Sequence, residues 1–280
     1  MKLLAVQRRE KIKAMLLERE TITVSEIMDT FHISVETARR DLDVLENDGF
    51  LDKIYGGATL KKRTKDLPSK PLLKQTFANG KRRVAERAVQ YMKRGDTIFL
   101  DNSSAVAYMC PGLMDLDITV LTNSLAVINA LSKSKTVKLI CIGGRYEPEE
   151  EAFLGPTAVA NLKRYQVDRA FFSCKSFDMK RGAMTANELL ADMKQAAIQC
   201  AQQTCMLVDH SKFDKASFIH LCGLQEVDRL FTDEPISEEW KKYFEGTHTK
   251  VYECLENSGE GRFPAVGEEL LEEYTAAEHT

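Results

Sequence analysis

Helical periods of apolar residues dominate the first part of the chain. They predict a helix over 8–19, a second over 25–31 with Ser25 as its cap, and a third that begins after Ser34. The short β-branched run at 21–24 predicts a minor strand. Two short helices joined by about four residues are typical of a helix-turn-helix.

The stretch 34–57 combines a helix, a stop and a ribbon. Its apolar residues recur at helical spacing and form one face: Val35, Ala38, Leu42 and Leu45. The helix is expected to end at Asp48-Gly49, because glycine accepts the left-handed conformation of a C-terminal cap. The run 50–55 closes on Gly56-Gly57, which predicts a β-ribbon with a tight turn. A helix followed by such a ribbon is the pattern of a recognition helix and its wing.

Polar residues of this stretch are candidates for contact with DNA. Backbone N–H groups and short side chains at a helix N-terminus can meet phosphates, and arginine can contact phosphate or a guanine edge. The candidates are Ser34, Glu36, Thr37, Arg39 and Arg40 on the helix, and Lys53, Tyr55 and Gly56 on the wing. A small helical bundle whose two arginines form a solvated face would show the same pattern, so patterning alone leaves both interpretations open.

Strand and helix periods alternate from Lys81 onward. Apolar strands are predicted near 97–101, 118–123, 137–144, 169–173, 204–209 and 227–233, with helical segments between most of them. This order predicts an α/β domain with a mostly parallel sheet over 77–250. The lysine-rich segment 59–76, which holds two prolines, is predicted to link it to a DNA-binding domain at 1–58.

Small and polar residues follow several of the predicted strands. In parallel sheets, ligands bind in the crevice at the carboxyl ends of the strands. Serines at helix starts favour an anion, glycines allow close backbone approach, and a lysine adds a point charge, so a phosphorylated small molecule would fit. These residues are Asp101, Ser103, Ser104, Thr122, Asn123, Ser124, Gly143, Gly144 and Lys212. Serine at such a junction is more often only a helix cap, and only the joint occurrence favours a site.

Composition narrows the class of protein. The 280 residues carry a net charge of −3 and 44% apolar residues, which fits a soluble protein whose nucleic-acid site is local. The chain shows neither a membrane-length apolar run nor a signal peptide, and its seven cysteines lack paired metal-ligand spacing. We therefore expect a cytoplasmic protein with reduced cysteines and without a metal or cofactor. The acidic segment 251–280 is expected to be disordered or to form a short frayed helix around 268–274.

The N-terminal stretch resembles the DNA-binding domain of the DeoR family of bacterial transcriptional regulators. The matching residues are Ser34, Thr37, Arg39-Arg40-Asp41-Leu42, Leu45-Glu46, Gly49 and Gly56-Gly57-Ala58. Ala38 replaces the isoleucine that the family usually shows, and Lys53 and Tyr55 replace its arginine and histidine on the wing. A cation and a polar ring are retained there, so the resemblance implies DNA binding and leaves the base sequence open.

The second half resembles the effector domain of the same family, which is similar to sugar-phosphate isomerases. The matching residues are Lys81, Gly95-Asp96-Thr97-Ile98, Asp101, Thr122-Asn123-Ser124, Gly143-Gly144, Leu154-Gly155, Phe171-Phe172-Ser173-Cys174, Gly182, Glu188, Lys194, Asp209, and Ser211-Lys212-Phe213. The loop that starts at Asp101 departs from the family by lacking a glycine and one hydroxyl. Through this resemblance Lys175 and Glu188 join the candidates for binding the effector.

Two classes of function follow. In the first, the chain is a homo-oligomeric regulator, a dimer or tetramer, that represses carbohydrate-utilisation genes. It binds double-stranded operator DNA under the control of a phosphorylated sugar. In the second, it is a sugar-phosphate isomerase with an accessory DNA-binding domain, with Asp101, Lys175 and Glu188 as an acid/base set. The first is favoured, because a shared fold does not transfer chemistry.

Overall fold

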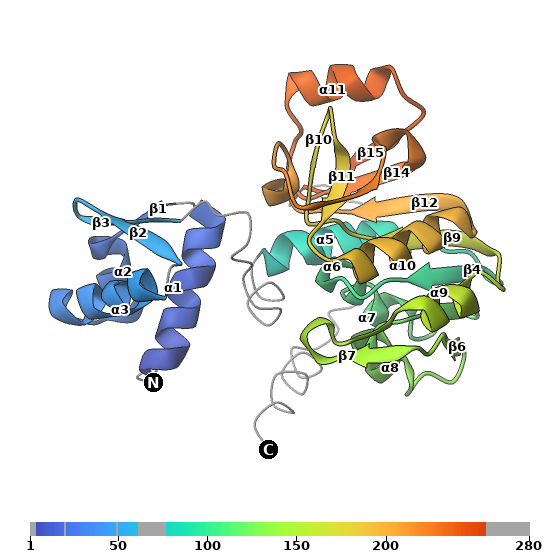
Figure 1. Cartoon of the computed structure of the whole chain (residues 1–280), viewed down its shortest axis with the longest axis horizontal. Helices are drawn as coiled ribbons and strands as arrows, with labels where there is room; N and C mark the ends of the chain where they lie inside the picture. The colour runs from blue at the N-terminus through green and yellow to red at the C-terminus, as the bar shows by residue number, and fades with distance from the viewer. Residues whose placement is uncertain (1–3, 20, 49, 61–76, 256–280) are drawn as a thin grey trace. The chain divides into compact units, whose positions relative to one another are not determined.

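The computed structural model describes residues 4–19, 21–48, 50–60 and 77–255 (Figure 1). The chain divides into two compact units, Met1–Ala78 and Asn79–Thr280. The predicted linker beyond residue 60 and the predicted tail beyond 255 lie outside the described residues.

The first unit packs three helices against a small antiparallel sheet. Its elements are α1 (Ala5–Arg19), β1 (Thr21–Thr23), α2 (Val24–Phe31), α3 (Val35–Asn47), β2 (Leu51–Ile54) and β3 (Gly57–Leu60). The sheet has the order β1-β3-β2, so β2 and β3 form the predicted ribbon and β1 pairs with its second strand. Buried side chains from all three helices and the sheet form one core: Ile12, Leu16, Ile22, Ile27, Leu42, Leu45 and Leu51.

Helix caps fix where the helices of this unit begin. The prediction that Ser25 caps the second helix is wrong: Thr23 is the cap, and its hydroxyl accepts the Glu26 N–H at 3.1 Å. The Glu26 carboxylate accepts the Thr23 N–H at 2.7 Å, so the two residues form a capping box. Ser34 is confirmed as the cap of α3, since its Oγ accepts the Thr37 N–H at 3.3 Å.

The second unit is an α/β domain, as predicted. Its helices are α5 (Ala78–Val89), α6 (Ser104–Ala107), α7 (Cys110–Leu113), α8 (Leu125–Leu131), α9 (Pro156–Leu162), α10 (Glu188–Gln199), α11 (Glu238–Glu245) and the short 3₁₀ turns η1 (Pro148–Glu150), η2 (His210–Lys212) and η3 (Leu224–Glu226). Its strands are β4 (Thr97–Leu100), β5 (Thr119–Thr122), β6 (Lys138–Cys141), β7 (Arg145–Glu147), β8 (Ala152–Leu154), β9 (Val167–Phe172), β10 (Ser176–Asp178), β11 (Gly182–Thr185), β12 (Ala201–Leu207), β13 (Ile219–Cys222), β14 (Arg229–Thr232) and β15 (Lys250–Glu253).

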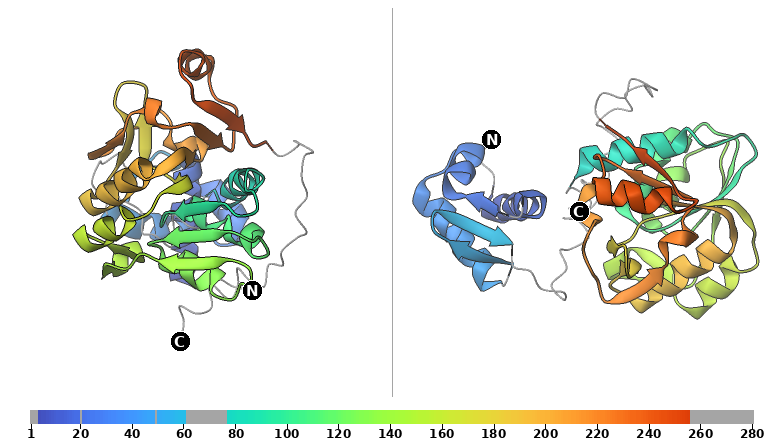
Figure 2. Two further views of the ribbon diagram at one scale, coloured as in Figure 1. Left: turned by 90° about the vertical axis from the view of Figure 1, so that its right-hand side faces the viewer. Right: turned by 90° about the horizontal axis from the view of Figure 1, so that it is seen from above.

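Seven parallel strands form the main sheet, in the order β15-β14-β12-β9-β4-β5-β6. Alternate residues of each strand enter different cores, as the two-residue period of a strand requires. On β4, Ile98 and Leu100 pack with α5 to α8, whereas Phe99 packs with α9 and α10. The sheet is therefore covered on both faces (Figures 1 and 2).

The structure adds elements that the sequence pattern did not predict. Strands β10, β11 and β13 form a separate antiparallel sheet, and β7 pairs with β8 in a hairpin. Strand β15 starts at the predicted domain end at 250 and continues three residues past it, and β3 continues two residues past the predicted boundary at 58. Each of these strands has only three or four residues, so periodicity offered little signal.

Candidate functional site

Helix α3 separates its charged residues between the interior and the surface. Asp41 is buried, and its carboxylate lies 2.5 Å from Nε of Arg8 and 3.6 Å from a guanidinium nitrogen of Arg9, both on α1. Arg39 and Arg40, its neighbours in the sequence, are exposed. The aspartate thus fixes α3 against α1, while the two arginines are available to an external anion such as a DNA phosphate.

The N-terminus of α3 presents the predicted short polar side chains. The hydroxyls of Ser34 and Thr37 are 3.1 Å apart, and Glu36 is exposed beside them. The backbone N–H of Glu36 itself, followed by the Ser34 hydroxyl, lowers the pKa of the Glu36 carboxyl. Glu36 is therefore an anion in the first turn of the helix that carries the two arginines, where a helix favours negative charge.

Lys53 of the wing, which was predicted as a cation that contacts DNA, is paired with carboxylates of α3. Its Nζ lies 2.5 Å from Asp43 and 3.4 Å from Glu46, both on α3, and its backbone N–H donates to Glu46 at 3.0 Å. The hydrogen bond to Asp43 is the main reason that the pKa of Lys53 is raised. These contacts hold the wing against the predicted recognition helix.

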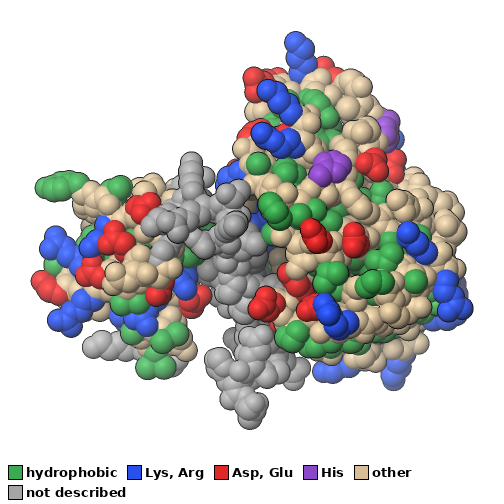
Figure 3. Space-filling model, viewed as in Figure 1, with side chains coloured by type: hydrophobic (Ala, Val, Ile, Leu, Met, Phe, Trp, Pro, Cys, Tyr) green, Lys and Arg blue, Asp and Glu red, His purple; other side chains and the backbone are tan. Residues whose placement is uncertain are grey.

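The tip of the wing is the most exposed part of the predicted DNA-binding surface. Tyr55 is fully exposed, and Gly56 has a φ of +77°, which favours glycine at this turn. Figure 3 shows hydrophobic side chains standing out from the end of the β2–β3 ribbon. The next residue, Gly57, is required for packing, because a Cβ there would lie 2.2 Å from the carbonyl oxygen of Ile22.

Lysines from different elements of the second unit converge on one buried carboxylate. Asp209 lies directly before η2, and Nζ of Lys212 is 3.8 Å from its Oδ2. Lys81 of α5 and Lys175, which follows β9, interact electrostatically with Asp209 and with Lys212. We call Lys81, Lys175 and Lys212 the lysine cluster. Lys175 and Lys212 were predicted for the effector site, whereas Lys81 was noted only as a matching position.

Burial determines the electrostatics of this cluster. Desolvation lowers the pKa of Lys81 and of Lys175 to about 8, and the neighbouring lysine charges add to that effect. Burial alone would raise the pKa of Asp209, but the ammonium groups of Lys212 and Lys81 outweigh it and lower that pKa. The cluster therefore carries more positive than negative charge in a place with little water, which suits a small anion.

Asp101, which was also predicted for the effector site, is engaged by groups within the protein. Its Oδ1 accepts the N–H and the hydroxyl of Ser103 at 2.8 and 2.5 Å. Its Oδ2 accepts the Ser173 N–H at 3.1 Å and lies 2.9 Å from Nζ of Lys194. The aspartate joins the ends of β4 and β9 to α10, so its first role is structural. Ser104 is half-buried at the start of α6.

The Thr122-Asn123-Ser124 segment leaves one polar atom unsatisfied. The Thr122 hydroxyl donates to the Leu100 carbonyl at 2.7 Å and accepts the Ser124 N–H at 3.0 Å, and Ser124 caps α8. Asn123 Nδ2 donates to the Phe153 carbonyl at 3.3 Å. Its side-chain Oδ1 is buried and accepts no hydrogen bond from the described residues. An unsatisfied buried acceptor is costly, which makes this oxygen a candidate partner for a ligand hydroxyl.

The two predicted glycines and Glu188 have different surroundings. Gly143 and Gly144 both have positive φ angles, and a Cβ on Gly144 would lie 2.7 Å from Cβ of Ala158 on α9. Gly144 thus permits close packing of the loop after β6 on that helix. Glu188 is exposed in the first turn of α10 and forms no ion pair within the described ranges. The geometry gives none of these three positions a direct part in the lysine cluster.

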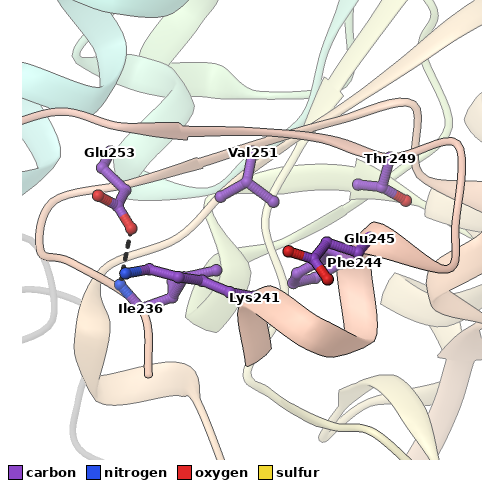
Figure 4. Close-up of a pocket in the computed structure, with 7 residues that line it drawn as sticks. All are labelled: Ile236, Lys241, Phe244, Glu245, Thr249, Val251 and Glu253. Atoms are coloured by element: carbon purple, nitrogen blue, oxygen red, sulfur yellow. Dashed lines mark hydrogen bonds between the residues drawn. The ribbon is translucent and has the colours of Figure 1, made fainter. Parts of the chain in front are cut away.

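A separate cavity of about 460 Å³ lies between α11 and β15 (Figure 4). Its lining includes Lys241, Glu245 and Glu253, and the Glu253 carboxylate accepts the Ile236 N–H at 3.0 Å. The cavity shares no lining residue with the lysine cluster. Its cation is matched by two carboxylates, so it lacks the excess positive charge of the cluster.

Within the described ranges, none of the helices has both the length and the apolar character needed to span a membrane.

Two family models match the chain, one on each unit. A DeoR-like helix-turn-helix domain matches residues 8–64, and a DeoR C terminal sensor domain matches residues 76–234. The first covers the helices and wing described above, and the second covers the lysine cluster. Together they account for well over half of the sequence.

Curated relatives match over most of their length. An HTH-type transcriptional regulator named YulB of Bacillus subtilis (strain 168) is 34% identical over 89% of this chain and 96% of its own. The L-fucose operon activator of Haemophilus influenzae is 37% identical over 80% of this chain and 90% of its own. The lactose phosphotransferase system repressor of Lactococcus lactis subsp. lactis is 36% identical over 85% and 96%.

Solved structures resemble the chain only distantly. Ribose 5-phosphate isomerase A of Methanocaldococcus jannaschii has a TM-score of 0.36 at 18% identity, with 49% of this chain and 55% of that chain covered. The delta subunit of eIF2B from Chaetomium thermophilum has a TM-score of 0.41 at 12% identity, with 79% of this chain and 70% of that chain covered. Likenesses this weak say nothing about activity.

Because the family models and the curated relatives agree, the chain belongs to the DeoR family, whose members are transcriptional regulators and not enzymes.

Proposed function

We propose that this regulator binds operator DNA through α3 and the wing, and that a phosphorylated sugar held by the lysine cluster controls that binding. The observation that carries the proposal is that Lys81, Lys175 and Lys212, which are buried or partly buried, gather around the buried carboxylate of Asp209, with Asp233 also acting on Lys81. Buried like charges repel one another, and a bound dianion would relieve that repulsion.

The charge of the cluster matches a phosphate monoester. The three ammonium groups of the cluster, together with Lys215, which acts on Lys175, outnumber the carboxylates of Asp209 and Asp233, so positive charge is in excess when the lysines are protonated. A phosphate ester carries roughly −1.5 to −2 at neutral pH. Such a ligand neutralises the cluster, whereas an uncharged sugar would leave the repulsion in place.

The sugar part of the ligand would be recognised by hydrogen bonds rather than by charge. The buried Oδ1 of Asn123 is an acceptor without a donor among the described residues, and a sugar hydroxyl can supply one. Because losing a hydrogen bond to a buried polar group is costly, this contact would discriminate between sugars. The other predicted polar residues of these loops would shape the crevice.

The relatives support a sugar ligand and leave the sense of the response open. One is named as a repressor of a lactose phosphotransferase system and another as an activator of an L-fucose operon. We infer a repressor of carbohydrate-utilisation genes that acts in the cytoplasm as a homo-oligomer. Two-fold related helix-turn-helix units match paired operator half-sites.

A thermal-shift screen of the whole protein tests the effector. We expect one or a few sugar phosphates to raise the melting temperature, since a ligand that binds only the folded state stabilises it. The free sugars and inorganic phosphate serve as controls for the two halves of the ligand. Absence of a shift with every pentose and hexose phosphate would contradict the proposal.

Two substitutions test whether the response to the ligand depends on the lysine cluster or only on the overall charge of the domain. Lys212→Ala should abolish the shift and the response of DNA binding to the ligand, and leave DNA binding without ligand intact. Lys180→Ala removes an exposed lysine from the same domain and is the matched control. An equal response in Lys212→Ala and in the control would exclude Lys212 from the site.

A further inference from the structure

His210 begins the turn that carries Lys212, and its imidazole lies beside two carboxylates that follow β14. Its Nδ1 lies 3.1 Å from Oδ2 of Asp233 and 3.1 Å from Oε1 of Glu234. The donor atoms of these three side chains all lie within 4.8 Å of one another. The proposed sugar-phosphate site uses none of the three.

The arrangement is unusual because one imidazole nitrogen faces two carboxylates. A single N–H can satisfy one acceptor well, and the two carboxylate charges beside it repel each other. Asp233 is 3% exposed, so its charge is poorly screened by solvent. A divalent cation in place of the nitrogen-bound proton would contact all three groups and balance both carboxylates.

The distances suit a metal ion. Ligand atoms about 2.1 Å from a shared ion lie about 3.0–3.4 Å apart in octahedral or tetrahedral geometry. The two nitrogen–oxygen distances of 3.1 Å fall within that range, and the ligand oxygens of Asp233 and Glu234 lie within 4.8 Å of each other. One imidazole and two carboxylates are a ligand set for first-row divalent ions such as zinc, cobalt or nickel.

The surrounding contacts hold the buried carboxylate in place. Oδ1 of Asp233 accepts the backbone N–H of His210 at 2.7 Å, and the Asp233 carbonyl accepts from Arg83 of α5 at 3.2 Å. A Cβ on Gly80 would lie 2.0 Å from Oδ2 of Asp233, so only glycine leaves room for the carboxylate there. Such outer contacts orient ligands in known metal sites.

We propose that His210, Asp233 and Glu234 form a binding site for a first-row divalent metal ion, with zinc as its best-suited occupant. The ion would replace the proton on Nδ1, and water would complete its coordination. His210 belongs to the same turn as Lys212, and Asp233 packs against Gly80 of α5, the residue before Lys81. A bound ion would therefore connect two elements that carry lysines of the cluster.

Isothermal titration of the full-length protein, without a histidine tag, with zinc chloride tests this site. We expect one equivalent of zinc to bind and to raise the melting temperature. His210→Ala and Glu234→Gln should each weaken binding at least about tenfold. Glu234 is exposed, so its substitution leaves a folded protein even where the histidine variant does not fold.

Two control variants distinguish this site from others. His248→Ala removes another exposed histidine that faces a carboxylate, Asp228, at 3.4 Å, and should bind zinc like the wild type. Cys141→Ser removes the cysteine that is exposed among those described and should also leave binding unchanged. Absence of zinc binding, equal affinity in Glu234→Gln, or loss of binding in Cys141→Ser would overturn the proposal.

Discussion

The two units place their cations in opposite environments. In the first, Arg39 and Arg40 are exposed on α3. In the second, Lys81 is 4% exposed, and burial lowers the pKa of Lys81 and Lys175 to about 8. Exposed cations bind a polyanion at little desolvation cost, whereas buried lysines have lost their hydration before any ligand arrives. The first surface suits a long anion read at many points, and the second suits one small anion.

The largest effect should come from the buried ion pair between Asp41 and Arg8 in the first unit. Asp41→Ala leaves Arg8 buried without its carboxylate, so we expect the unit to lose about 3–5 kcal/mol of unfolding free energy. Calorimetry measures this loss, and the transition of the second unit should not change. Asp29→Ala, which removes an exposed aspartate on α2 of the same unit, is the control. Equal losses in both variants would contradict a special role for Asp41.

The buried lysines should make stability depend on pH in a definite direction. The pKa of Lys175 is about 8 in the folded protein and about 10.5 when unfolded, so the unfolded chain binds more protons between these values. The charge of Lys175 therefore costs stability below pH 8, and the cost disappears as pH rises from 8 toward 10.5. Lys175→Met removes that cost.

This substitution should stabilise the second unit by on the order of 2–3 kcal/mol at pH 7, and the gain should shrink by pH 10. Chemical unfolding at the two pH values measures the difference. Lys180→Met removes an exposed lysine instead and should show no such trend. A gain that is the same at both pH values would mean that Lys175 is not desolvated.

Removing the exposed cations should weaken DNA binding without unfolding the protein. Arg39→Ala with Arg40→Ala should cost roughly 1–3 kcal/mol of binding free energy and flatten the dependence of affinity on salt. Fluorescence anisotropy with operator DNA at several salt concentrations measures both. Lys11→Ala, an exposed cation on α1, is the matched control. Unchanged affinity in the double variant would exclude α3 as the recognition helix.

The smallest effect should come from the contact between the wing and α3. Glu46→Ala removes the acceptor of the Lys53 N–H and one partner of its ammonium group, so DNA affinity should fall by a few-fold, about 0.5–1 kcal/mol. Glu46→Gln keeps the acceptor and should recover most of the affinity. A gain of affinity in Glu46→Ala would instead show that Glu46 withholds Lys53 from DNA.

Local signals in the sequence predicted the elements that are periodic or capped. The third helix and its Ser34 cap, the ribbon, and the mostly parallel sheet are confirmed, because each depends on residues close together in the chain. The cap at Ser25 was wrong because the reciprocal bonds of Thr23 and Glu26 begin the helix earlier. The antiparallel sheet β10-β11-β13 and the hairpin β7–β8 were missed, since their short strands are stabilised by partners elsewhere in the fold.

The sequence by itself determined the class of the protein: helix periods, caps and glycine turns specify the winged unit, and apolar strands between helices specify the α/β domain. Only the tertiary structure decided which polar residues are paired within the protein and which gather in a buried, charged cluster. Asp41, Asp101 and Thr122 look like site residues or their neighbours in the sequence, yet their polar atoms are paired within the protein. Lys81 joins a cluster more than ninety residues away along the chain. Burial and long-range electrostatics depend on which distant segments meet, and no local pattern encodes that.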